Sequence, residues 1–274
     1  RTQQNLGLLA MARGRWEPAR ALLETSLADA ERQQMVEEAA VSHRNLAELE
    51  LWQGHVARAL EQARQAEDLF RQREDRRGIA DVRLLRAQAL LAAHADARTA
   101  DVLDALEPVL VDASAEQRAI ERLLRAQIAR RAGEDEAATA ARRQARALAL
   151  ASGVRHLQLQ IALESARAGE PAPELGDATA RLGHAGLRLA WLEWRMREAL
   201  AEDAPADALA AWREAAILLR EGDFVRTHRL QALAAQALAA SGDDAAASAA
   251  SNRAQQAFES MRNALPDPLR ATFE

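Results

Sequence analysis

The chain lacks three residue types altogether: cysteine, lysine and tyrosine are absent from its 274 residues. Without cysteine there is no disulfide framework and no thiolate-bound metal. Cysteine usage therefore does not indicate whether the protein works in an oxidising or a reducing compartment. Without lysine, every fixed basic charge on a side chain is an arginine. We interpret this bias as a result of nucleotide composition and not of selection for guanidinium chemistry.

Long hydrophobic runs are also missing. No run approaches the roughly 18 apolar residues that a membrane-spanning helix needs, and the N-terminus lacks a signal-peptide pattern. The net charge is -5 with both signs mixed, which argues against a general nucleic-acid binder, because such domains are usually strongly basic. We expect a cytoplasmic location, with the periplasmic sensor region of a membrane-anchored kinase as the alternative.

Catalytic and metal-binding motifs are missing as well. The histidines form no HExxH motif and no pair four residues apart, so no zinc site is indicated: His43, His55, His94, His156, His184 and His228. There is no GxSxG motif and no glycine-rich phosphate loop after a strand. The acidic residues belong to a chain that is 28% charged, and none is singled out. We expect neither an enzyme nor a resident cofactor or metal.

What the sequence does contain is a repeat. Residues 1–34 laid over residues 41–74 align Asn5 with Asn45, Gly14 with Gly54 and Ala19 with Ala59. The shared glycine ends a first helix, and the shared alanine lets a second helix pack against it. A self-similar period of this length predicts a solenoid of stacked helical hairpins.

This pattern resembles tetratricopeptide repeats (TPR), in the variant of about 40 residues common in bacterial regulators. The family's small residue of the first helix recurs along nearly the whole chain, as Gly7, Ala47, Ala87, Ala126, Ala162 and Ala235. The resemblance implies an all-α fold, a right-handed superhelical α-solenoid of about seven TPR-like hairpins. We expect one domain over 1–274 with repeats at 1–34, 35–77, 78–114, 115–153, 154–185, 186–221 and 222–263, and a C-terminal cap at 264–274 over the end of the stack.

The third, fifth and sixth repeats fit the pattern loosely, and prolines disturb the third and the fifth. Pro108 interrupts the second helix of the third repeat, so that helix is expected to be kinked or short. Before the third repeat, an arginine- and aspartate-rich turn is expected to end at Gly78. Pro171 and Pro173 force an extended connection in the fifth repeat. Because the chain also starts in the middle of a repeat, we expect it to be a fragment of a longer protein.

The tail carries a second resemblance. Leu265, Pro266, Leu269, Arg270 and Phe273 are similar to the LP-x-x-LR-x-x-F ending of repeat arrays in large bacterial signalling proteins. Those proteins include serine/threonine kinases, cyclases and signal-transduction ATPases, some of them transcription activators. This resemblance implies attachment to a catalytic or regulatory domain.

The first helices of the hairpins, here called the A helices, line the inner surface of a TPR superhelix. Their register predicts a partner-binding groove made of Asn5, Arg44, Asn45, Glu48, Trp52, Gln88, Gln127, Arg130 and Arg131. Amides, aliphatic side chains and isolated charges suit an extended peptide or a partner helix. A chaperone-type carboxylate clamp is not expected, because Leu8 occupies one of its positions.

Several of these residues have alternative roles. Asn5 and Asn45 could form a ladder along a bound main chain, or each could brace its own hairpin. Trp52 could be an exposed anchor, or it could fill the gap beneath Met11 and Leu91. We expect the aromatic group Trp191, Trp194 and Trp212 to be core. An arginine cluster with its last three members on the outer helix indicates a solvated, salt-bridged face in preference to a phosphate or nucleic-acid site: Arg130, Arg131, Arg142, Arg143 and Arg146.

Two functions remain. The first is a protein-interaction module of a bacterial signalling protein, binding a protein or peptide in the groove to recruit partners or control an attached catalytic domain. The alternative is a small-molecule sensor domain of a repeat-containing transcription activator, in which the irregular third and fifth repeats shape an inducer pocket.

Overall fold

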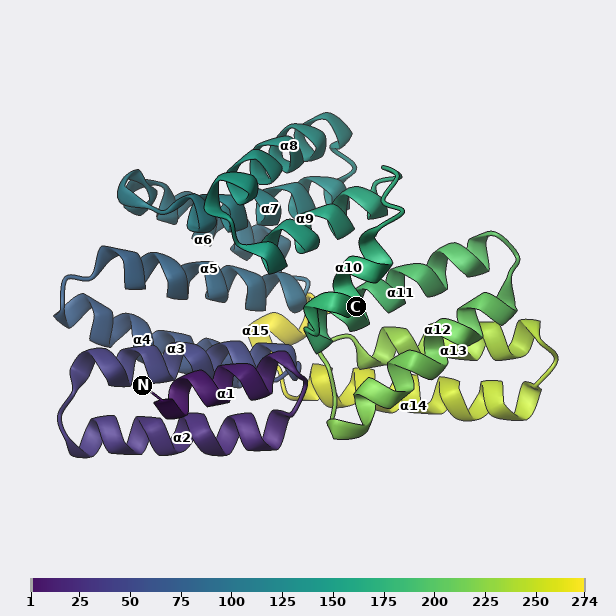
Figure 1. Ribbon diagram of the computed structural model, residues 1–274, viewed down its shortest axis with the longest axis horizontal. Helices are drawn as coiled ribbons and strands as arrows, with labels where there is room; N and C mark the ends of the chain where they lie inside the picture. The colour runs from purple at the N-terminus through teal and green to yellow at the C-terminus, as the bar shows by residue number, and fades with distance from the viewer. Residues whose placement is uncertain (1, 274) are drawn as a thin grey trace.

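The protein is an all-α solenoid of seven helical hairpins followed by a short C-terminal helix (Figure 1). The computed structural model describes residues 2–273, Glu221 by its backbone only, so the outermost residues of the expected first repeat and cap lie outside the described part. The first four hairpins pair α1 with α2, α3 with α4, α5 with α6, and α7 with α8. Their bounds are Thr2–Ala12, Trp16–Arg32, Val36–Trp52, Val56–Gln72, Arg76–Ala92, Asp96–Leu106, Ala115–Ala132 and Asp135–Ser152, with a 3-10 helix η1 at Glu107–Asp112.

The remaining three hairpins pair α9 with α10, α11 with α12, and α13 with α14. Their helices are Arg155–Arg167, Leu175–Leu182, Ala185–Ala201, Pro205–Leu218, Thr227–Ala240 and Asp244–Asn263, with a 3-10 turn η2 at Leu219–Glu221 and the final helix α15 at Asp267–Arg270. One sequence-based expectation was wrong: Gly78 lies inside the first turn of α5 and does not end a turn, because the Asp75 side chain caps that helix by accepting a hydrogen bond from the Gly78 amide at 3.0 Å.

The turns of the first three hairpins repeat every 20 residues. A residue with positive φ ends each turn, in the order Gly14, Gln34, Gly54, Glu74 and His94. The helices between these turns, α2 to α5, are each 17 residues long. His94 therefore takes over the backbone role of the glycine it replaces, with φ 58° against 82° at Gly54, although this conformation is unfavourable for a residue with a Cβ.

Small residues allow the close helix crossings that the repeat pattern predicted. A Cβ added to Gly7 would lie 2.9 Å from Cδ2 of Leu23, and Ala47 is fully buried where α3 packs on its neighbours. The buried apolar residues form several separate clusters along the array, most of them between neighbouring helices. No single globular core accounts for these described clusters, as expected for a solenoid.

The two irregular hairpins behave as the prolines predict. The α-helix α6 ends at Leu106, and Pro108 lies in η1, where the tighter 3-10 turn accommodates its ring. In the fifth hairpin, the connection through Pro171 and Pro173 leaves only the eight residues of α10 for the second helix. Both hairpins thus present a shortened outer helix.

Buried glutamates connect successive hairpins. Five of them are at most 3% exposed: Glu50, Glu67, Glu121, Glu164 and Glu193. Glu67 on α4 accepts hydrogen bonds from Arg83 and Arg86 on α5, both at 2.8 Å. Glu50, Glu164 and Glu193 also bond arginines of a neighbouring hairpin. Glu121 instead bonds Arg125 of its own helix, and Arg125 crosses to the exposed Asp104 of α6.

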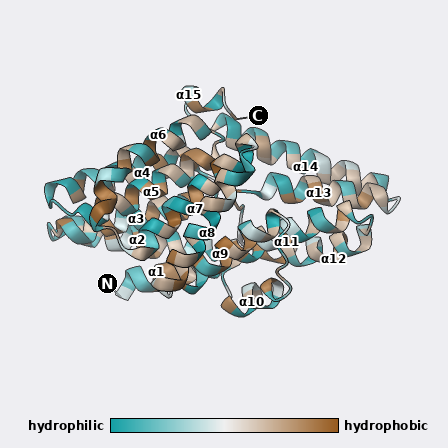
Figure 2. Ribbon diagram, turned by 90° about the horizontal axis from the view of Figure 1, so that it is seen from above, coloured by the Kyte–Doolittle hydropathy of each residue, from teal (hydrophilic) through white to brown (hydrophobic). Residues whose placement is uncertain are grey.

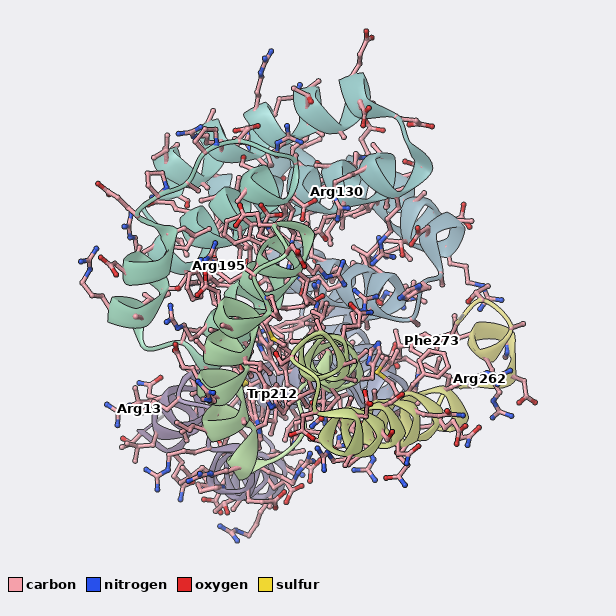
Figure 3. The ribbon with its side chains drawn as sticks, turned by 90° about the vertical axis from the view of Figure 1, so that its right-hand side faces the viewer. Arg13, Arg130, Arg195, Trp212, Arg262 and Phe273 are labelled. Carbon is pink, nitrogen blue, oxygen red and sulfur yellow. The ribbon has the colours of Figure 1, made fainter. Side chains whose placement is uncertain are left out.

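The superhelix closes on itself. Leu265, Leu269 and Phe273 of the tail share an apolar cluster with residues of the second and third hairpins, among them Val56 and Leu90. Figure 1 shows the yellow α15 beside the blue helices of that region. Figure 3 labels Phe273, which follows α15 in the tail. The expectation that the tail covers a free end of the stack is therefore wrong: it lies between the last hairpin and hairpins two and three.

A second contact closes the ring at the end of α3. The Val225 amide, in the connection between α12 and α13, donates a hydrogen bond of 2.8 Å to the Trp52 carbonyl. Hydrophobic and hydrophilic residues are interleaved along the helices (Figure 2). Within residues 2–273, every helix falls short of the length and apolarity needed to cross a bilayer.

The junction glutamates give a first prediction. Glu67→Gln removes a charge that holds Arg83, Arg86 and Arg71, and should lower the free energy of unfolding by about 3 kcal/mol, because the arginines lose a buried counter-charge. Urea unfolding followed by circular dichroism measures it. The control Glu61→Gln removes the same charge from a solvated pair with Arg64 and should leave the midpoint nearly unchanged. Equal effects of the two substitutions would contradict the role of Glu67 as a buried counter-charge for these arginines.

Candidate functional site

The expected groove residues begin on α3, where Arg44 and Glu48 lie one helical turn apart. Both side chains are half-buried. Arg44 donates to the Oδ1 of Asn45 at 2.8 Å, its one hydrogen bond among the described residues. Glu48 forms no hydrogen bond or ion pair within residues 2–273, and its charge acts at longer range on Asp81 and His184. These two residues thus retain bonding capacity for a partner.

The two asparagines do not share an environment. Asn5 on α1 is exposed, whereas Asn45 is 1% exposed and accepts the bond from Arg44. The interpretation in which each residue serves its own hairpin describes Asn45 better than a ladder does.

Trp52 is not a free anchor. Its ring lies 5.2 Å from that of His184 and stacks on Phe224 at 5.9 Å. A Cβ at Gly186 would lie 2.5 Å from its six-membered ring, so only glycine fits there. Trp52 also packs against the cluster that contains Met11, as one of the two interpretations from the sequence predicted. Its other neighbours lie in the sixth and seventh hairpins, so the predicted contact with Leu91 is replaced by contacts there.

The glutamines of α5 and α7 differ in their bonding. Gln88 is half-buried and has no hydrogen-bond partner among residues 2–273. Gln127 donates a long hydrogen bond of 3.4 Å to Glu164. Gln88 is therefore the amide on this face that remains available.

Arg130 and Arg131 lie at the end of α7, where several segments converge. Arg130 donates to Glu164 at 2.5 Å, while Arg131 donates to the Leu91 carbonyl at 3.1 Å and to Asp96 at 2.7 Å. Figure 3 shows Arg130 at the side of an interior filled with side chains. Each arginine thus links α7 to a neighbouring hairpin.

The convergence forms what we call the central arginine cluster, defined as Arg130, Arg131, Arg167, Arg226 and Arg229. Glu193 of α11 joins its members: it accepts from Arg226 at 3.0 Å and lies 3.9 Å from Arg167. Arg229 donates to Nε2 of His94 at 2.7 Å. Sequence reasoning missed Arg226, Arg229 and Glu193, because only ring closure brings the start of α13 to the ends of α5 and α7.

The electrostatics of this cluster are strongly perturbed. Burial, followed by the charge of Arg226, lowers the pKa of Arg167 to about 10, and the same two causes lower the pKa of Arg229 to about 10. Burial alone would raise the pKa of Glu193, but the surrounding arginines, Arg226 first, outweigh it and lower that pKa to about 2. Such perturbation is typical of functional sites, although structural ion-pair networks produce it as well.

The remaining sequence-based groups lie elsewhere. Arg142 is buried and donates to Glu170 at 2.8 Å, whereas Arg143 and Arg146 are exposed on α8. Trp191, Trp194 and Trp212 are partly buried against apolar clusters, as the core interpretation predicted. Within residues 2–273, no three histidine or acidic side chains gather as a metal site would require.

An open groove of about 770 Å³ lies on the outer side, where α6 is short. Leu110 and Val111 of η1 line one part of it and Leu148 of α8 another, with Arg118 and Arg122 of α7 between them. Val111 is 79% exposed. This groove exists because Pro108 ends the α-helix early.

Comparisons with known proteins support the fold. No protein-family model matches the chain, and no curated protein is significantly similar to it. Among solved structures, the chain is similar to a Rap protein complexed with competence and sporulation factor, with a TM-score of 0.67 and 13% sequence identity over 96% of this chain and 76% of that one. Together with the consecutive helical hairpins, this likeness supports an all-α fold of helical repeats.

The ring closure predicts a pH dependence of stability. Burial first, then nearby arginine charges, lowers the pKa of both His94 and His228 to about 4, against about 6.5 in an unfolded chain. His94 is surrounded by Arg229, Arg131, Arg226 and Asp96, and His228 by Arg229, Arg226, Glu193 and His94. Both rings also contact Phe273.

Below pH 6.5 the unfolded chain therefore binds protons that the folded chain does not, so stability should fall as the pH drops from about 6.5 to about 4. Urea midpoints at pH 7.5 and pH 5.0 measure this change. The double variant His94→Asn, His228→Gln should show a smaller difference between the two midpoints, since asparagine tolerates the positive φ at position 94. An undiminished difference would show that other groups cause it.

Proposed function

We propose that this chain is a protein-interaction module of a bacterial signalling protein. It binds a protein or peptide segment against the inner faces of α3, α5 and α7, and in this way recruits partners or controls an attached catalytic domain. We place it in the cytoplasm.

The observation that carries this proposal is a pair of half-buried polar side chains without partners. Glu48 on α3 and Gln88 on α5 make no hydrogen bond within residues 2–273, while Arg44 makes a single hydrogen bond, to Asn45. Because both side chains are partly exposed, a ligand can reach their free donors and acceptors. A bound main chain offers amide and carbonyl groups to them.

The likeness to Rap supports the same conclusion. That structure is a complex with competence and sporulation factor, and its fold corresponds to 96% of this chain. A similar superhelix is thus used for binding in that protein, and the tail sequence resembles repeat arrays of signalling proteins.

Binding would act through the superhelix. Each hairpin mainly contacts its neighbours, so small rotations accumulate along the array and change its pitch. The extended connection around Pro171 and Pro173 is the hinge in this proposal, since α10 is the shortest hairpin helix and makes the fewest packing interactions. Ring closure then converts a change of pitch into a change at Trp52 and Phe273.

A second candidate function is a small-molecule sensor domain. The outer groove of about 770 Å³ favours it, because the irregular third hairpin shapes that groove and the volume suits a metabolite-sized inducer. A thermal-shift screen tests it, since a ligand at 100 times its dissociation constant stabilises by about 2.7 kcal/mol.

Site-specific photo-crosslinking tests the proposed function. A benzoylphenylalanine at Gln88 should capture a defined segment of one protein in the source cell, identified by mass spectrometry. The same group at Leu150, exposed on α8, is the matched control and should not capture it. The double substitution Arg44→Ala, Glu48→Ala should weaken binding by about a hundredfold or more, as expected for two lost charged hydrogen bonds, and reduce the adduct at position 88 accordingly. Equal capture at both positions would contradict binding to the inner face.

A further inference from the structure

The central arginine cluster contains more positive than negative charge. Its five arginines face three carboxylates, those of Glu164, Glu193 and Asp96. Glu164 and Glu193 together hold Arg130, Arg167 and Arg226. Arg131 has only Asp96, which it reaches through a single nitrogen. Arg229 has no carboxylate within ion-pair distance among residues 2–273, and its one hydrogen bond goes to a histidine.

The excess charge is not spread over an outer surface. Arg226 and Arg229 lie at the start of α13, and Arg229 reaches His94 while Arg131 of α7 bonds Asp96 two residues further on. After burial, the charge of Arg226 contributes to the lowered pKa of Arg131, and the charges of Arg226 and Arg131 contribute to the lowered pKa of Arg229. Like charges held this close in a partly buried place repel one another, and few solvent molecules screen them. The fold nevertheless brings three of them together from two distant hairpins.

Solvent reaches the cluster. The side chains of Arg130, Arg226 and Arg131 are 36%, 28% and 26% exposed. A ligand group could therefore contact these guanidinium groups without unfolding of the ring. Arg131 bonds both Leu91 and Asp96 through Nη1, so its Nη2 and Nε remain as donors, and in Arg229 the Nη1 and Nε remain.

We propose that Arg131, Arg226 and Arg229 bind an acidic group, a carboxylate or a phosphate, carried by the partner. This inference rests on the proposed function and adds the chemistry of its ligand. Guanidinium groups match both acids because each offers parallel N–H donors to two oxygens. The N-terminal end of the fourteen-residue helix α13 adds a partial positive charge at the same place. A bound anion would offset the repulsion among the three arginines.

The test uses the whole chain and two simple probes, inorganic phosphate and citrate, each replacing chloride at constant ionic strength. Thermal unfolding should shift upward with either probe in a saturable way. Arg229→Gln, which removes no carboxylate contact, should weaken the apparent affinity by about tenfold or more, the usual loss for a charged hydrogen bond. Arg131→Gln should act in the same direction.

Arg143→Gln is the matched control, because it removes one positive charge from the exposed face of α8 and should leave the shift unchanged. A response to phosphate alone would assign a phosphorylated partner, and a response to citrate alone a carboxylate. Two results would overturn the inference: no saturable shift with either probe, or equal shifts in all three variants. Loss of the anion effect with persistent crosslinking at Gln88 would leave the proposed function intact, whereas anion binding without any crosslinked partner would remove that function and keep the anion site.

Discussion

A buried carboxylate bonded to arginine is the interaction on which this superhelix depends. Each such glutamate is almost inaccessible, and four of the five bond an arginine of a neighbouring hairpin; at the junction between hairpins three and four, Arg125 bonds the exposed Asp104 instead. Such pairs add little net stability, because dehydration of the charges offsets their attraction, but a wrongly placed hairpin would leave a buried charge unpaired. We infer that they fix how each hairpin is rotated on the previous one. Arginine suits this role because its fork bonds two acceptors at once, as Arg188 does with Glu214.

Fixed rotations accumulate until the array meets itself. The connection before α13 then reaches the end of α3, and the tail reaches hairpins two and three. This closure has opposite consequences for the two halves of the inner face. Trp52 is covered by His184 and Phe224, while Arg44, Glu48 and Gln88 keep bonding capacity. Closure also assembles the central arginine cluster from segments that no local pattern connects.

The fold was largely predictable, since it follows from local signals: glycines at the turns, small residues at the crossings, and prolines that shorten α6 and interrupt the fifth hairpin. The position of α15 was not predictable, because it depends on the sum of small rotations along the array. For the same reason the register identified Arg130 and Arg131 but not their neighbours Arg226 and Arg229. The environment of Trp52 was ambiguous because its neighbours lie in hairpins more than 130 residues away.

The function proposed here needs the closed ring, since both the covered and the available parts of the inner face result from it. A designed disulfide tests closure most directly. A Cβ at Gly54 would lie 3.9 Å from that of Val225, within the range of disulfide-bonded cysteines, and the chain has no other cysteine to interfere. In the variant Gly54→Cys, Val225→Cys, oxidation of the folded protein should form the intramolecular disulfide nearly completely, as measured by mass spectrometry of its peptides. If both thiols stay free in the folded, oxidised protein, the ring is open and the account is wrong.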